Sequence, residues 1–145
     1  MERTALGLLA RREHARRELR TKLLARGHAE TDVERVLDEL EGRRLLSEDR
    51  FVEQFIASRV ARGTGPVKIR AELVARGVAE AVIAAALAAA ETDWRALAER
   101  VRQKRFGPVL PATSAERARQ ARFLAARGFT QEQVRGALRG DLDEG

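Results

Sequence analysis

The 145-residue sequence contains no cysteine and no tyrosine, and it has only two histidines, His14 and His28. The lack of cysteine excludes disulfide bonds, thiolate metal sites and cysteine nucleophiles. Neither histidine has metal-ligand spacing such as HExxH, so both are expected to be solvated or partly buried helix residues. No apolar run is long enough to cross a membrane, and the first residues lack the apolar length and cleavage site of a signal peptide. These absences predict a cytoplasmic protein.

Motifs for catalysis and nucleotide binding are also missing. The glycine-rich segment 62–66 has no following Lys-Ser pair and is typical of a turn. Ser47, Ser58 and Ser114 lack the surrounding sequence of a nucleophile elbow. Carboxylates are numerous, but they lie among arginines at helical spacing, as in ordinary ion pairs along a helix. We therefore predict no catalytic residues, no metal, no cofactor and no enzymatic activity.

Strand-forming residues do not alternate over any useful length, whereas alanine and arginine, which favour helices, dominate the sequence. The hydrophobic fraction of 44% beside 34% charged residues is typical of a folded chain. The few aromatic side chains include Phe51, Phe55, Trp94 and Phe123, which fall in register with other apolar positions. They are expected in the core, not as platforms for stacking nucleobases.

Three segments of similar sequence end in glycine, at Gly27, Gly77 and Gly128. The glycines are 50 and 51 residues apart. Arginine stands directly before each glycine, and leucine stands four positions before each glycine. A β-branched apolar residue stands six positions after each glycine and leucine stands ten positions after it. These residues are Val33, Ile83 and Val134, and Leu37, Leu87 and Leu138. Agreement at so many offsets indicates three repeats.

Each of these glycines is expected to end a helix, because glycine enters the left-handed conformation without steric cost. A second helix begins a few residues later, most clearly at Thr130, where Gln133 completes a capping box. The helix before each glycine and the helix after it form a helical hairpin. A further helix precedes each hairpin. The other expected helix starts are Ser47, Pro66, Thr92 or Asp93, and Thr113 or Ser114.

The sequence thus predicts an all-α fold with about nine helices in three tandem three-helix repeats. A unit of roughly 45 residues seldom buries enough apolar surface to stand alone, so the repeats should stack into an elongated array. The expected boundaries are 1–44, 45–91 and 92–140, followed by an acidic tail at 141–145.

A net charge of +6 favours a polyanionic partner, meaning nucleic acid, an acidic membrane or an acidic protein surface. Of the 28 basic residues only three are lysines. A composition rich in arginine and alanine is also typical of a biased genome, so the excess has a second interpretation. Arginine pairs with carboxylates as well as with phosphates, so charge alone does not distinguish DNA from an acidic protein.

Basic residues form clusters that are the candidates for partner contact. The candidates in the first two helices are Arg11, Arg12, Arg16, Arg17 and Arg20. Those near the turn at 63–66 are Arg59, Arg62, Lys68, Arg70 and Arg76. Further basic residues are Arg100, Arg102, Lys104 and Arg105, with Arg117, Arg119 and Arg122 on the next helix. Each cluster has the alternative role of merely solvating a helix face.

Several segments together resemble the RecX family of bacterial recombination regulators. They are ALGLLARREH at 5–14, ELRTKL at 18–23, SEDRFVEQFIASR at 47–59, GPVKIRAEL at 65–73, RGV at 76–78, DWRALA at 93–98, KRFG at 104–107 and RFLAARGF at 122–129. The likeness covers nearly the whole chain, in order. It departs at Ala15, where the family often has serine. This difference removes an N-cap and leaves the start of the second helix open.

The resemblance implies tandem three-helix repeats and a partner, the RecA recombinase, chiefly as its filament on single-stranded DNA. Proteins of this family bind in the filament groove or cap its growing ends, and so restrain ATP hydrolysis, strand exchange and coprotease activity. The resemblance therefore implies a monomeric regulator of recombination, with roles in DNA repair and the SOS response. Arg59, Arg62, Lys68 and Arg70 are the preferred contact face.

Two other functions remain open on the sequence. A basic helical DNA-binding or architectural protein that acts without RecA would fit the charge, although no recognition helix with a dimerisation element is evident. A helical adaptor for an unrelated acidic protein would fit it equally well. An enzyme is the least favoured alternative.

Overall fold

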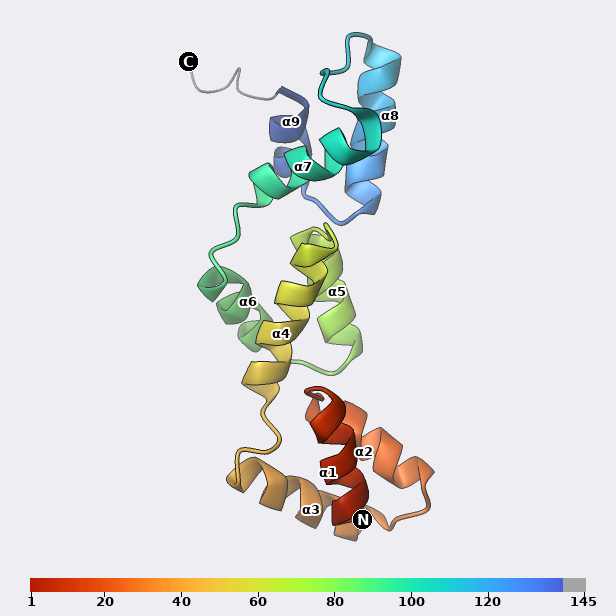
Figure 1. Ribbon diagram of the computed structural model, residues 1–145, viewed down its shortest axis with the longest axis vertical. Helices are drawn as coiled ribbons and strands as arrows, with labels where there is room; N and C mark the ends of the chain where they lie inside the picture. The colour runs from red at the N-terminus through yellow and green to blue at the C-terminus, as the bar shows by residue number, and fades with distance from the viewer. Residues whose placement is uncertain (140–145) are drawn as a thin grey trace. The chain divides into compact units, whose positions relative to one another are not determined.

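The computed structural model describes residues 1–139, in which the chain forms nine α-helices and no strand (Figure 1). The helices are α1 (Glu2–Arg11), α2 (Arg16–Ala25), α3 (Glu30–Gly42), α4 (Glu48–Ala61), α5 (Pro66–Ala75), α6 (Glu80–Ala89), α7 (Trp94–Phe106), α8 (Ser114–Ala126) and α9 (Gln131–Arg139). The predicted all-α class and number of helices are confirmed for this range. None of the nine helices is both long and apolar enough to span a bilayer. The expected acidic tail, 141–145, lies outside the described residues.

The repeated glycines have the backbone conformation that their position in the sequence predicts. Gly27, Gly77 and Gly128 have φ angles of 87°, 88° and 101° and directly follow the last turns of α2, α5 and α8. Only glycine adopts this left-handed region without strain from a Cβ atom. The same local signal therefore ends a helix at equivalent places in all three repeats.

Most of the expected helix caps are present. Thr130 and Gln133 form the capping box: Thr130 Oγ1 accepts from Gln133 N at 3.2 Å, and Thr130 N donates to Gln133 Oε1 at 2.9 Å. The other side-chain caps are Ser47 Oγ with Arg50 N at 3.3 Å, Asp93 Oδ1 with Ala96 N at 3.0 Å and Thr113 Oγ1 with Glu116 N at 3.1 Å. The start of α2, which the sequence left open, is at Arg16. Ala15 precedes this helix and provides no side-chain cap.

The described residues form two compact units: residues 1–55 with 73–86, and residues 56–72 with 87–139. In the first unit, α1, α2 and α3 share a core of aliphatic side chains, including fully buried Leu19, Leu23 and Leu37. Burial of one such leucine contributes roughly 1.5–3 kcal/mol. Phe51 and Phe55 are buried in this unit, as expected.

In the second unit, α7, α8 and α9 share another core, which contains Leu97, Leu124 and Phe129. Trp94 and Phe123 are only partly buried against this core, so the expectation that both are core residues holds only in part. The partial exposure of Phe123 matters for the candidate site, because its ring forms one wall of a cavity.

His14 differs from its prediction, because it lies in the segment between α1 and α2 and is 1% exposed. Its Nε2 atom is 2.9 Å from Lys22 Nζ and its Nδ1 atom is 3.1 Å from the carbonyl oxygen of Arg12. The ammonium of Lys22 can only donate, so Nε2 accepts and Nδ1 carries the proton that is donated to Arg12 O. This arrangement requires a neutral ring.

Burial lowers the pKa of His14 below its ordinary value of 6.5. Well above this value, neither the folded nor the unfolded chain binds a proton at this ring. As the pH falls below it, the unfolded chain binds a proton first. We therefore expect the free energy of unfolding to decrease between about pH 7.5 and about pH 5.5, measured by urea denaturation. The variant His14→Gln should lose much of this dependence, and equal slopes for both proteins would contradict the assignment.

Candidate functional site

Two arginines of the first basic cluster, Arg16 and Arg20, are neutralised by carboxylates of α3. The closest contacts join Arg16 Nη2 to Glu34 at 2.7 Å and to Asp38 at 2.9 Å, Arg16 Nη1 to Glu41, and Arg20 to Glu30 and Glu34 at 2.6 Å each. Hydrogen bonds from Arg16 and then from Arg20 hold the pKa of Glu34 below its ordinary value. These two arginines therefore join α2 to α3, which is a structural role that their spacing along α2 did not indicate.

Other predicted contact residues of the first unit also have partners within it. Arg12 Nη2 lies 2.8 Å from Glu18, and Arg76 Nη1 lies 3.5 Å from the same carboxylate. The guanidinium carbon of Arg76 also lies 4.9 Å from the centroid of Phe55. The side chain of Arg17 covers Gly77, since a Cβ atom added there would be 2.4 Å from Arg17 Cδ.

Arg11 is exposed at the end of α1. Within residues 1–139 it has no ion pair or hydrogen bond from its side chain. Arg17 likewise forms no side-chain ion pair or hydrogen bond within these residues, so Arg11 and Arg17 are the two arginines of the first cluster that no carboxylate neutralises.

The second cluster is more open. Arg59 and Arg76 are the exceptions: Arg76 contacts Glu18 as described above, and Arg59 Nε donates to Glu72 at 2.7 Å from a side chain that is only 17% exposed. Arg62, Lys68 and Arg70 are exposed around the turn between α4 and α5. Neither Arg62 nor Lys68 has a carboxylate partner in the described part of the chain.

Two apolar residues are exposed on α5, the helix that also carries Lys68 and Arg70. Val67 is 54% exposed and Val74 is 44% exposed, although valine is usually buried. Seven positions separate them, so both lie on one face of α5, with Arg70 and Ala71 between them. This face combines exposed valines with basic side chains, as protein-binding surfaces often do.

The turn between α4 and α5 is held by the turn between α8 and α9. Gly65 N donates to Arg127 O at 2.8 Å and Val67 N donates to Gly128 O at 2.9 Å. The guanidinium of Arg127 donates to the carbonyl of Arg62 and, at 3.4 Å, to that of Gly63. In the sequence, Arg127 is only the arginine that precedes the third repeated glycine. Its main contact, with residues more than sixty positions away, is tertiary.

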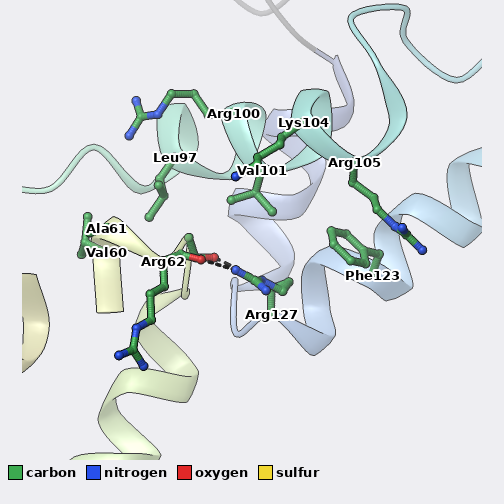
Figure 2. A pocket seen from close by; sticks show the side chains of 11 residues that line it. Val60, Ala61, Arg62, Leu97, Arg100, Val101, Lys104, Arg105, Phe123 and Arg127 are labelled. Carbon is green, nitrogen blue, oxygen red and sulfur yellow. Dashed lines mark hydrogen bonds between the residues drawn. The ribbon is translucent and has the colours of Figure 1, made fainter. Parts of the chain in front are cut away.

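A cavity of about 680 Å³ opens beside these two contacting turns (Figure 2). Its lining residues are Val60, Ala61, Arg62, Gly63, Leu97, Arg100, Val101, Lys104, Arg105, Phe123 and Arg127. Five of the eleven are cationic and none is acidic. Figure 2 shows Arg105 reaching toward Phe123, whose ring centroid is 5.7 Å from the guanidinium carbon.

The sequence identified Arg100, Lys104 and Arg105, which lie on α7, as a basic cluster, but it did not indicate a cavity. Arg102, placed in the same cluster, is only 2% exposed and donates to the carbonyls of Gly107 and Val109 at 3.3 Å each. Its inclusion as a surface residue was wrong. Helical periodicity would have separated Arg102 from the exposed residues. Arg100 and Lys104 are one turn apart and share a face of α7, whereas Arg102 lies two positions from each and points to the opposite face.

Three segments of the chain match known family domains. Residues 3–40, 47–87 and 91–138 match the first, second and third three-helix domains of RecX, respectively. A regulatory protein RecX from Halorhodospira halophila is 56% identical over 92% of this chain and 83% of the relative. One from Pseudomonas putida GB-1 is 46% identical over 99% of this chain and 93% of the relative.

Solved structures have the same fold. The crystal structure of RecX from Lactobacillus salivarius aligns with a TM-score of 0.83 over 99% of this chain and 94% of that chain, at 17% identity. A second crystal structure of regulatory protein RecX aligns with a TM-score of 0.76 over 92% of this chain, at 20% identity. At such identities the likeness supports the fold and says nothing of individual residues.

Proposed function

Because the chain belongs to the RecX family of regulatory proteins, we propose that it binds the RecA recombinase, chiefly as a filament on single-stranded DNA. Binding would restrain ATP hydrolysis, strand exchange and coprotease activity. RecX is a family of regulatory proteins and not of enzymes. The observation that carries the proposal is the match to all three RecX domains, in order, along nearly the whole chain. The same proposal includes a monomer acting in the cytoplasm in DNA repair and the SOS response.

We place the contact on the exposed first turns of α5 and the turn before it, which we call the α5 face, defined by Arg62, Val67, Lys68 and Arg70. Exposed Val67 supplies apolar area, and the basic groups supply attraction for acidic protein surface or DNA phosphates. Most basic residues of the first unit are weaker candidates because carboxylates already neutralise them. The proposed repeat boundaries, 1–44, 45–91 and 92–140, put this face in the central repeat.

The test is DNA-stimulated ATP hydrolysis by RecA, measured with and without this chain. We expect inhibition at substoichiometric concentrations, because a protein that caps or lines a filament acts on many RecA subunits. No effect at several-fold excess and low salt would contradict the proposal. In that case the charge would favour a DNA-binding protein that acts without RecA.

A further inference from the structure

The cavity beside Arg127 has walls and a rim of different chemistry. Val60, Leu97, Val101 and the ring of Phe123 give it an apolar interior. Arg62, Arg100, Lys104, Arg105 and Arg127 give it a cationic rim. No uncharged hydrogen-bonding side chain is among the residues that line it. A ligand that fits must bury apolar surface and carry several negative charges around it.

The rim is not balanced by carboxylates from the protein. Among the described residues, Arg62, Arg100, Lys104 and Arg105 have no acidic partner, and Arg127 is bonded to backbone carbonyls. Arg16 and Arg20, in the first unit, show the contrasting case, since each contacts at least two carboxylates. Uncompensated cations around one opening attract anions and bind carboxylates through paired hydrogen bonds.

The walls favour a peptide over a nucleotide. Nucleobases bind by stacking on open aromatic or guanidinium planes and by hydrogen bonds to their edges. The single aromatic wall, Phe123, is already covered by Arg105 and is in T-shaped contact with Phe106 at a centroid distance of 5.3 Å. The remaining walls are aliphatic, and they suit a leucine or phenylalanine side chain.

We propose that this cavity binds an acidic peptide segment of a partner protein, with one bulky apolar side chain inserted and flanking aspartates or glutamates on the arginine and lysine rim. This site shares only Arg62 with the α5 face, and it goes beyond the proposed function, since it does not require the partner to be RecA.

The test uses the full chain and a short fluorescent peptide that has one phenylalanine between aspartates and glutamates, with binding followed by anisotropy. In Arg100→Ala/Lys104→Ala we expect affinity to fall about tenfold, because two charge-assisted contacts are removed from exposed positions. The matched control is Arg117→Ala/Arg122→Ala, which removes the same charge from exposed sites on α8 outside the cavity. This control should bind the peptide within about twofold of the unmodified chain.

A second peptide replaces the phenylalanine by serine and keeps the charge. It should bind about tenfold more weakly, because the apolar walls then lose their occupant. Equal affinity for the two peptides, or equal losses in the two double variants, would overturn the proposal. An oligothymidylate of matched charge is measured in the same way. If Arg100→Ala/Lys104→Ala weakens binding of the oligothymidylate but not of the peptide, the ligand is nucleic acid instead. Binding only to a chain ending at Arg139 would identify the occupant as the chain's own segment 140–145. RecA is absent from these experiments, so their failure leaves the proposed function untouched.

Discussion

Replacement of Gly65 by alanine is expected to destabilise the protein by about 3 kcal/mol. A Cβ atom at this position would lie 2.3 Å from the carbonyl carbon of Gly128 and 2.4 Å from Phe129 N, which are backbone atoms that cannot rotate away. The two turns would have to separate, and the hydrogen bonds from Gly65 N and Val67 N would be lost with them. Urea denaturation followed by circular dichroism measures the change, and the midpoint of thermal unfolding should fall by about 10 °C.

Gly7→Ala is the matched control for this prediction. Gly7 lies inside α1, and nothing is within 4 Å of an added Cβ atom. The same change should therefore stabilise the chain by about 0.5–1 kcal/mol, because alanine loses less backbone entropy in a helix. If both variants have unchanged stability, the close approach of the two turns is not a feature of the protein in solution.

The parts of the fold that the sequence predicts are those with local causes. A glycine that ends a helix, such as Gly77, acts through its own backbone angles, and the capping box at Thr130 and Gln133 forms between neighbours in sequence. Both signals can be read from a few adjacent residues. The close contact of Gly65 with Gly128 has no such signal, because its cause is another turn more than sixty residues away.

The candidate site follows the same division. The sequence shows where basic residues cluster, but only tertiary packing decides which remain available. Arg16 and Arg20 face the acidic side of α3, Arg102 turns inward, and Lys68 stays exposed. His14 was misjudged for the same reason, since its burial depends on the helices around it. Charge counted along the sequence therefore overestimates the charge that a partner meets.

Arg62→Ala/Lys68→Ala is expected to raise about tenfold the concentration of this chain needed for half-inhibition of RecA ATP hydrolysis. Both side chains are exposed and have no carboxylate partner in residues 1–139, so their removal should leave folding intact. Two charge-assisted contacts with the filament would account for a loss of this size. Arg59 is kept in this variant, because its removal would leave Glu72 without its hydrogen bond and lower stability.

The matched comparison is Arg16→Ala, which removes an arginine that α3 already neutralises. Its loss should lower the free energy of unfolding by roughly 1–2 kcal/mol, because three carboxylates on α3 lose their shared cation. Inhibition of RecA should stay within about twofold of the unmodified chain at temperatures where the variant is folded. The two variants thus separate a structural role of arginine from a binding role. A loss of inhibition in Arg16→Ala with none in Arg62→Ala/Lys68→Ala would move the contact from the α5 face to the first unit.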